Sequence, residues 1–250
     1  MIGSKDFGVS GNDHFTNQRM FTDYGTEITY FSCAKCGFTF TNALDSWSDK
    51  DFRDHIYNDD YLLSDPVFES ERPERNANML IAFFPDEISQ LSLLDFGGGN
   101  GAFSKKLSRL GCKADSFDYF HDQSNKNYPI TKKYDLVTSF EVIEHIPHYK
   151  QHDWMKSLQR FLTPTCYARV ILSTKLLAPP ISIDNWYIAP RNGHISIHSP
   201  LSLKHLASSV GLSLFSINKS MHFLSHTGND KIFNQQTDIT FSTASLSVAC

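Results

Sequence analysis

The feature that most constrains the fold of this chain is a glycine cluster that directly follows a short apolar run. Residues 91–96 read Leu-Ser-Leu-Leu-Asp-Phe, and residues 97–101 read Gly-Gly-Gly-Asn-Gly. An apolar run that ends at glycines is typical of a buried parallel strand ending at a ligand-binding turn. Apolar residues then recur at helical spacing from Phe103 to Leu110, so a helix begins within the loop. A strand, a glycine turn and a helix N-terminus together present backbone N–H groups to an anionic ligand.

Two classes of ligand fit this loop. Residues 97–102 satisfy the dinucleotide fingerprint G-x-G-x-x-A, and Asp118 lies at a suitable distance for a ribose hydroxyl. Residues 95–101 read D-x-G-x-G-x-G, which resembles motif I of the class I S-adenosylmethionine-dependent methyltransferases. The loop by itself leaves both interpretations open.

A second run, over residues 134–148, decides between them. It reads Tyr-Asp-Leu-Val-Thr-Ser-Phe-Glu-Val-Ile-Glu-His-Ile-Pro-His. This run resembles the fourth strand and the following motif of the same methyltransferases, in the branch marked by Glu-His after the strand. With both motifs in the family's order, the resemblance covers roughly residues 55–225. It implies an α/β, Rossmann-like methyltransferase fold with a mostly parallel sheet, which ends in an antiparallel strand pair formed by residues 212–218 and either 221–225 or 239–243.

The composition excludes several classes of protein. The chain has 250 residues, of which 40% are hydrophobic and 20% are charged, as in a folded domain with a full core. Its net charge of −4 argues against a nucleic-acid partner, since phosphate binding usually needs a basic face. The five cysteines favour reduced thiols, and no run approaches the about 20 apolar residues that span a bilayer. We therefore expect a cytoplasmic protein with no membrane span, acting on a small-molecule or glycan acceptor.

The chain is expected to divide near residue 70. Residues 1–70 would form an N-terminal appendage and lid segment, and residues 71–250 the catalytic domain. Strands flanking Cys33-Ala-Lys-Cys36 predict a hairpin with a knuckle, which is half of the zinc ribbon that many relatives carry. Because no cysteine precedes Cys33, we expect a degenerate knuckle without metal, and a zinc site completed by other ligands stays an open alternative.

Local patterns predict several further elements. Residues 1–25 have few periodic apolar residues and predict a loop, and helices are expected over residues 48–62 and 74–84. Only residues 120–133 separate the second strand from the fourth. Their Asn and Pro content predicts that the family's usual helix in this interval is lost or reduced to a turn.

The resemblance implies which residues hold the cofactor, S-adenosylmethionine. The glycines allow close approach of the backbone, and the helix start faces the methionine carboxylate. Asp118, at the carboxyl end of the second strand, can accept hydrogen bonds from both ribose hydroxyls, and Tyr119 and Phe120 would cover the adenine. In relatives, tyrosines of the segment before the first strand lie over the cofactor, which indicates Tyr57 and Tyr61. The expected cofactor residues are Asp95, Gly97, Gly99, Gly101, Asp118, Tyr119 and Phe140.

Acidic and imidazole side chains gather after the fourth strand. Glu141, Glu144 and His145 share one face if a helical turn begins there, and the later loop carries His194 past the same edge of the sheet. The set resembles the metal-binding residues of small-RNA 2′-O-methyltransferases and the Glu-His set of ubiquinone-biosynthesis O-methyltransferases. Three interpretations stay open: a divalent cation held by all four residues, a metal-free site with His145 or His194 as the catalytic base, or carboxylates that only brace the loop.

The long connection over residues 175–199 predicts the acceptor site, because an ordered loop of this length is uncommon unless it is functional. Trp186, Tyr187 and Arg191 suit a sugar with a carboxylate or phosphate, and His198 completes the expected acceptor residues. Branch members with this layout often serve polysaccharide or sugar-nucleotide pathways. We therefore expect an O-methyltransferase of a sugar hydroxyl on a glycan or sugar intermediate. The alternatives are a small aromatic or lipid-like acceptor, an NAD(P)-dependent enzyme, and a catalytically silent binding domain.

Overall fold

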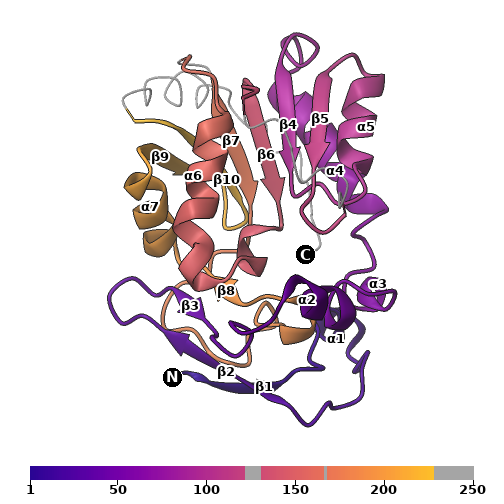
Figure 1. Ribbon diagram of the computed structural model, residues 1–250, viewed down its shortest axis with the longest axis vertical. Coiled ribbons are helices and arrows are strands. Elements are labelled where there is room, and N and C mark those ends of the chain that lie inside the picture. The colour runs from indigo at the N-terminus through magenta and orange to yellow at the C-terminus, as the bar shows by residue number, and fades with distance from the viewer. Residues whose placement is uncertain (122–130, 166–167, 228–250) are drawn as a thin grey trace.

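A computed structural model of the protein describes residues 1–121, 131–165 and 168–227. At its centre is a six-stranded sheet in the order β5-β4-β6-β7-β10-β9 (Figure 1). β5, β4, β6 and β7 are parallel, and β10 is antiparallel to both β7 and β9. This topology confirms the Rossmann-like fold and places the closing antiparallel pair at residues 212–226. The strands are β4 (Ser92–Phe96), β5 (Lys113–Phe117), β6 (Leu136–Phe140), β7 (Arg169–Ser173), β9 (Leu212–Ser216) and β10 (Met221–His226).

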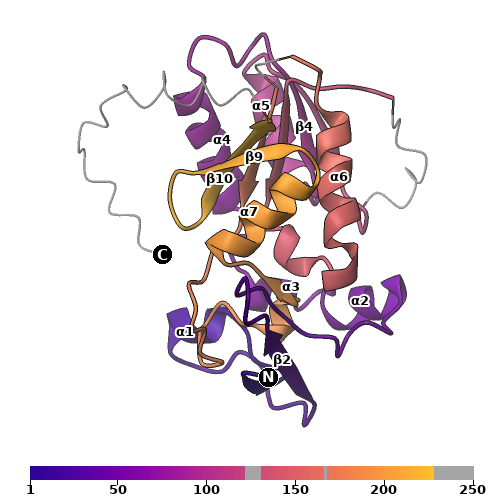
Figure 2. The ribbon, with the colours of Figure 1, turned by 90° about the vertical axis from the view of Figure 1, so that its left-hand side faces the viewer.

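Helices cover both faces of this sheet (Figure 2). Because successive side chains of a strand point to opposite faces, Leu93 and Leu94 of β4 belong to two different cores. Leu93 packs with residues of α4 and α5 on one face, and Leu94 packs with residues of α6 and α7 on the other. The four helices are α4 (Glu71–Phe83), α5 (Ala102–Arg109), α6 (Gln151–Phe161) and α7 (Pro200–Ser209).

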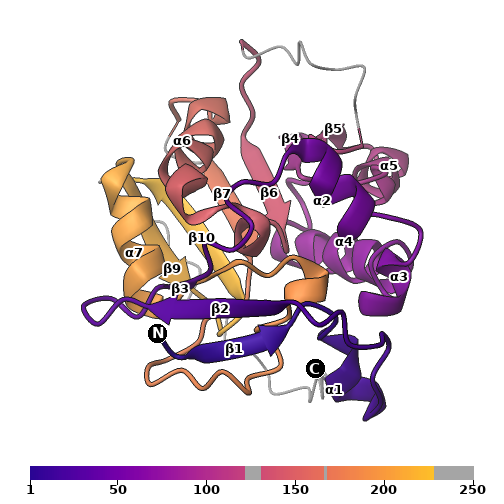
Figure 3. The same ribbon diagram turned by 60° about the horizontal axis from the view of Figure 1, so that its bottom comes forward.

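A second, four-stranded sheet lies across the carboxyl edge of the first (Figure 3). Its order is β1-β2-β3-β8, so three N-terminal strands are joined by one strand from the long connection after β7. Thr39 of β3 pairs with Ile197 of β8. A third core contains buried residues of both segments, among them Tyr30, Ile56 and Ile195. The strands are β1 (Gly3–Asp6), β2 (Glu27–Ser32), β3 (Thr39–Phe40) and β8 (Ser196–Ile197).

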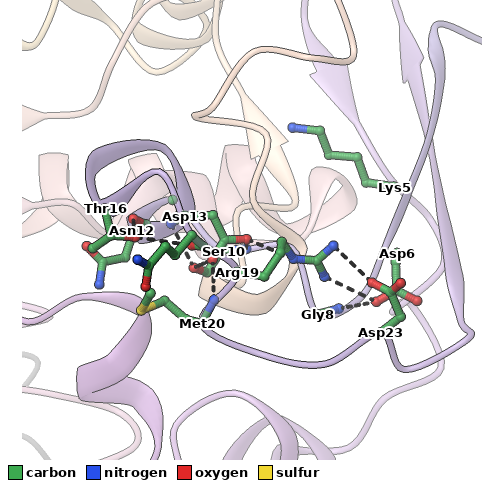
Figure 4. A network of polar contacts seen from close by, with 12 residues as sticks. Lys5, Asp6, Gly8, Ser10, Asn12, Asp13, Thr16, Arg19, Met20 and Asp23 are labelled. Carbon is green, nitrogen blue, oxygen red and sulfur yellow. Dashed lines mark hydrogen bonds and ion pairs between the residues drawn. The ribbon is translucent and has the colours of Figure 1, made fainter.

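Residues 1–25 were expected to be a loop, and this is wrong in part, because they contain β1 and α1 (Asn12–Thr16). Figure 4 shows the polar contacts that order them. Arg19 forms ion pairs with Asp6, Asp13 and Asp23 at 3.9, 3.2 and 2.9 Å. Such contacts leave no hydrophobic periodicity in the sequence, which is why the pattern predicted no structure here.

The helix expected over residues 48–62 is broken. α2 (Asp49–His55) is capped by Ser48, and α3 (Tyr61–Ser64) follows after a gap. Between the two helices, Arg191 donates from Nη1 to the carbonyl of Ile56 at 3.0 Å and from Nη2 to Asn58 Oδ1 at 2.9 Å, which connects this segment to the long loop after β7.

The remaining local expectations have mixed outcomes. α4 begins at Glu71, earlier than the helix expected over residues 74–84. The interval of residues 120–133 falls mainly on residues 122–130, which lie outside the described residues. The division near residue 70 stays a prediction.

Candidate functional site

The glycine turn after β4 forms at the carboxyl edge of the sheet, where the sequence predicts it. A Cβ at Gly97 would lie 2.5 Å from Val142 Cγ2, and one at Gly98 would lie 2.2 Å from Asp95 Oδ2. The turn therefore excludes side chains, and its backbone leads directly into the N-terminus of α5, as an anion-binding turn requires. Three of its glycines have left-handed φ angles: Gly97 (84°), Gly99 (55°) and Gly101 (72°).

Asp95 lies beneath this turn and is 3% exposed. Burial raises the pKa of Asp95 to about 7, against the opposing effect of a 3.4 Å hydrogen bond from Thr138 Oγ1. Asp95 Oδ2 and Ser116 Oγ are buried and have no hydrogen-bond partner within the described part of the chain. Both oxygens are therefore available to a ligand in the turn.

Asp118 follows β5 at the same edge. Its Oδ2 accepts a 2.9 Å hydrogen bond from Gly99 N, and its Oδ1 accepts from Phe120 N at 2.8 Å and His121 N at 3.0 Å. The carboxylate therefore connects the glycine turn to the end of β5. This is the position from which a carboxylate reaches a ribose in folds of this kind.

Tyr119 and Phe120 lie in different surroundings. Tyr119 is 62% exposed, and its hydroxyl donates to Asp49 Oδ2 at 2.7 Å, so its ring does not cover the glycine turn. Phe120 packs against Tyr57 with ring centroids 4.8 Å apart, and the Tyr57 ring lies 6.1 Å from that of His145. The aromatic surface near His145 comes from Phe120 and Tyr57, both expected from the sequence, and the adenine contact of Tyr119 stays a prediction.

A pocket opens between the glycine turn and α4. Phe140 was expected here from the sequence, whereas Phe68, Arg72 and Asn76 were not, since the stretch before the glycine motif carries no motif of its own. Arg72 forms a bidentate pair with Asp65, at 2.6 and 2.8 Å, which ties the start of α4 to the preceding segment. The pocket is lined by residues that include Phe68, Arg72, Asn76, Asp95, Gly97, Asn100 and Phe140.

The acidic pair after β6 is fixed by hydrogen bonds. Glu141 has a φ of 54°, a strained value for this residue type, and its Oε1 accepts from Ser173 Oγ at 2.7 Å. Glu144 lies on the short 3-10 helix η2 (Ile143–His145) and is fully buried. The carbonyl of Glu144 accepts a 2.9 Å hydrogen bond from Ile195 N, so the turn after β6 is joined directly to the long loop after β7.

Glu144, His145 and His194 converge. Each brings one ligand atom to within 4.8 Å of the others, and the two imidazole rings lie 5.1 Å apart. Glu144 Oε2 and His145 Nδ1 are buried and find no hydrogen-bond partner among the residues that the structure describes. Glu141, the fourth predicted metal ligand, is not part of this group.

The surroundings of the group favour its uncharged forms. Burial raises the pKa of the Glu144 carboxyl well above its usual range, and the nearby Glu141 raises it further. Burial lowers the pKa of His145 well below its usual value, with a further contribution from His194, and burial also lowers the pKa of His194. A divalent cation would reverse the preference of Glu144 by stabilising its carboxylate, and it would reinforce the neutral imidazoles of His145 and His194.

Tyr187 connects Glu144 to His194. Its hydroxyl donates to Glu144 Oε1 at 2.8 Å, and Glu141 Oε2 lies 3.3 Å away. The carbonyl of Tyr187 lies 2.8 Å from His194 Nδ1. Since a carbonyl can only accept, His194 carries its proton on Nδ1 and leaves the Nε2 lone pair free. Tyr187 is 2% exposed, so the structure gives it a positioning role rather than the predicted acceptor contact.

The other predicted acceptor residues differ in whether a ligand can reach them. Arg191 is fully buried, and both Nη atoms are engaged, which closes the guanidinium to an external carboxylate or phosphate. His198 is 2% exposed and lies between Gln151 Oε1 and Ser202 Oγ at 3.1 and 3.0 Å. Trp186 is half-buried, with Lys175 Nζ 4.3 Å from its ring centroid. Of the four, Trp186 alone stays accessible.

The N-terminal segment holds the long loop in place. Tyr30 donates to the carbonyl of His194 at 2.9 Å, and Lys5 Nζ donates to the carbonyls of Asn185 and Ile188, each at 2.9 Å. Residues 1–40 therefore hold His194 in position, and no sequence pattern indicates this contact.

Comparison with known sequence families identifies the family to which the chain belongs. A sequence family described as "Methyltransferase domain" matches residues 68–217, which include the glycine turn, the group after β6 and the antiparallel strand β9. The chain belongs to this family. It is a methyltransferase that uses S-adenosylmethionine, and the dehydrogenase alternative is thereby set aside. No sequence among curated proteins matches the chain significantly.

Solved structures of methyltransferases are similar to this methyltransferase at low identity. The magnesium protoporphyrin IX methyltransferase of Synechocystis PCC 6803 with bound SAH is 16% identical, with a TM-score of 0.47 over 72% of this chain and 94% of its own. An O-methyltransferase family protein from Burkholderia thailandensis is 12% identical, with a TM-score of 0.47 over 72% and 63%. Human N-acetylserotonin methyltransferase with SAM is 15% identical, with a TM-score of 0.42 over 72% and 62%.

Among the described residues of this methyltransferase, no helix is both long and apolar enough to cross a membrane.

Proposed function

We propose that this methyltransferase transfers the methyl group of S-adenosylmethionine to a hydroxyl of a glycan or sugar intermediate. The observation that carries the proposal is the convergence of Glu144, His145 and His194 next to the cofactor pocket. Phe140 lines that pocket, and η2 begins three residues after it. A carboxylate and two imidazoles at this position are the groups that activate a hydroxyl, whether by binding a cation or by accepting a proton.

The donor is oriented by the glycine turn, the start of α5 and Asp118. The turn and helix N-terminus bind the methionine carboxylate, and Asp118 binds the ribose, exchanging its backbone hydrogen bonds for ribose hydroxyls. Holding donor and acceptor in line supplies much of the rate enhancement of a methyl transfer. The acceptor oxygen attacks the methyl carbon, the carbon–sulfur bond breaks with its electrons passing to sulfur, and S-adenosylhomocysteine leaves.

The residues of the group fit a divalent cation. Glu144 Oε2 and His145 Nδ1 are buried without partners in the described chain, and a mixed carboxylate and imidazole set suits Mn²⁺, Fe²⁺ or Zn²⁺. Such a cation, when bound, lowers the pKa of the acceptor hydroxyl. Glu144 and His145 would hold it, while Glu141 keeps its bonds to Ser173 and Tyr187.

His194 takes the proton of the acceptor hydroxyl at Nε2. Its Nδ1–H is held by the carbonyl of Tyr187, which fixes the tautomer that makes Nε2 a base. The lowered pKa of His194 keeps it unprotonated at neutral pH, ready to accept. The backbone of His194 is itself held by Tyr30, so the base is positioned from both sides.

A small aromatic acceptor is the second candidate, and a specific feature favours it. Tyr57, Phe120 and Phe52 form a continuous aromatic group, with successive ring centroids 4.8 and 6.2 Å apart, and Tyr57 also contacts His145. Aromatic rings in such a group can stack on a phenolic acceptor as readily as on the apolar face of a sugar.

The test combines binding, acceptor choice and metal dependence. Isothermal titration should show binding of S-adenosylmethionine and none of NAD. Labelled methyl transfer to methyl glucoside and to catechol then distinguishes the two acceptor classes. Activity should fall in EDTA and return with Mn²⁺ or Zn²⁺. Glu144→Gln should lose activity, whereas the control variant, exposed Glu69→Gln, should keep it. Full activity in EDTA would remove an exchangeable cation from the proposal, and transfer to catechol alone would replace the sugar by the aromatic acceptor.

A further inference from the structure

A second concave surface lies at the same edge of the sheet as the cofactor pocket. This surface, the lysine groove, is formed by the start of the long loop after β7 and the turn that joins β9 to β10. Because β10 is antiparallel to β7 and Met221 pairs with Ser173, the β9–β10 turn lies where the parallel strands end. Two backbone hydrogen bonds join its walls, from Thr174 N to Ser220 O at 3.2 Å and from Leu176 N to Lys219 O at 2.7 Å.

The lysine groove is positively charged although the chain is acidic. Lys175 and Lys219 line it, and no Asp or Glu is among its lining residues in the described chain, whereas the whole chain has a net charge of −4. Lys175 Nζ lies 4.3 Å from the ring centroid of Trp186. A cation–π contact holds an ammonium group in place without neutralising it, so its charge stays available to an anion.

The rest of the lining suits a small polar molecule. Leu176 and Ile181 supply apolar surface, and Ser182 and Asn218 supply polar groups. Apolar surface with a few polar groups and a fixed charge is typical of sites that orient a ligand. The groove has a volume of about 670 Å³, which is large enough for a sugar with a charged substituent.

The backbone of Lys175 is hydrogen-bonded to the catalytic group through Tyr187. The backbone N–H of Lys175 donates to the hydroxyl of Tyr187 at 3.0 Å, and that hydroxyl donates to Glu144 Oε1 at 2.8 Å. Lys175, which lines the groove, is therefore linked to the Glu144 carboxylate through two hydrogen bonds. Tyr187 lies between the groove and Glu144, so a ligand held by the lysines would reach this carboxylate by extending past Tyr187.

We propose that the lysine groove binds a negatively charged group of the acceptor, a carboxylate or a phosphate, and that the acceptor is an acidic sugar. Lys175 and Lys219 would contact the anion, while Leu176 and Ile181 contact the apolar face of the sugar ring. This inference rests on the proposed function and gives it a substrate class. It also supplies the anion contact that the buried Arg191 cannot make.

Binding is tested first, without turnover. Glucuronate, glucose 1-phosphate and neutral methyl glucoside are titrated against the full chain, with tryptophan fluorescence as the readout because Lys175 contacts the Trp186 ring. We expect saturable binding of an anionic sugar that weakens with added salt. The double variant Lys175→Gln/Lys219→Gln should weaken it about tenfold or more. A matched double variant of exposed lysines, Lys113→Gln/Lys156→Gln, removes the same charge and should leave binding unchanged.

Comparison of the two anions shows whether the groove favours a carboxylate or a phosphate. Equal affinity for charged and neutral sugars, or an unchanged affinity in the Lys175→Gln/Lys219→Gln variant, would overturn the proposal. The failure of the proposed function gives a different result: binding would need the two lysines, yet no labelled methyl would reach any of the three sugars. If transfer occurs, kcat/KM should favour the anionic sugar in the wild type and lose that preference in the lysine variant.

Discussion

Asp95→Asn should make the ligand-free protein more stable at alkaline pH. Asp95 is 3% exposed, and burial raises the pKa of its carboxyl from an ordinary 3.8 to about 7. An acid with a raised pKa binds protons more tightly when folded, so the free energy of unfolding falls as pH rises from about 4 to 7. At 1.36 kcal/mol per pH unit, the full difference corresponds to about 4 kcal/mol above pH 7. Asparagine has the same shape and no charge, so it avoids this cost.

The local geometry also accommodates the new amide. Asp95 Oδ2 and Ser116 Oγ would lie 2.2 and 2.4 Å from a Cβ at Gly98, so both oxygens face the same point, and neither has a partner within the described chain. An amide N–H in place of Oδ2 can donate to the serine hydroxyl. Allowing for relaxation of the site, we expect a gain of about 2–4 kcal/mol at pH 8, or about 4–15 °C in Tm for a chain of this length.

The assay is urea unfolding of wild type and Asp95→Asn at pH 5 and pH 8, without cofactor. The difference between the two proteins should be large at pH 8 and smaller at pH 5, and the exposed Asp86→Asn should change little at either pH. The variant should also bind S-adenosylhomocysteine more weakly, since a carboxylate below the glycine turn is lost. A variant that is less stable at pH 8, or a gain that is equal at both pH values, would refute the reasoning.

Three further predictions concern the site. Asp118→Ala should weaken S-adenosylmethionine binding by about 1.5–3 kcal/mol in calorimetry, the scale of hydrogen bonds to a charged group, and unchanged affinity would mean that the ribose contact lies elsewhere. His194→Ala should lower kcat about 100-fold or more while cofactor affinity is retained, and normal turnover would remove it as the base. Tyr30→Phe should cost about 1 kcal/mol of unfolding free energy and also lower kcat, because its hydroxyl holds the backbone of His194; a stability loss with unchanged kcat would limit Tyr30 to a structural role.

The central fold was predictable because its signals are local. The apolar run before Asp95 and the glycines after it are short patterns that specify a strand end and a tight turn, and both form as expected. The convergence of Glu144, His145 and His194 could also be predicted, because the topology brings the carboxyl ends of neighbouring parallel strands to one edge of the sheet.

The parts that the sequence did not reveal depend on contacts between distant residues. Nothing near Arg191 in sequence indicates that its guanidinium binds the carbonyl of Ile56, more than 100 residues earlier. The pairing of β3 with β8 joins two-residue strands, which are too short to leave a period-2 pattern. The sequence did not predict that Arg72 lines the pocket beside the glycine turn. A single arginine on an amphipathic helix cannot be distinguished from any other exposed charge.

The shared sheet of β1, β2, β3 and β8 has a consequence for how acceptor preference in this enzyme could be changed. A loop that only connected β7 to α7 could be exchanged alone, but this one takes part of its hydrogen bonding and its core from residues 1–56. Transplanting the loop from a relative would leave Thr39, Tyr30 and Lys5 facing the wrong partners and would misplace the imidazole at residue 194. The N-terminal segment and the loop therefore form a single exchangeable unit made of two pieces of chain. Engineering of substrate range, or natural divergence of it, has to change both pieces together.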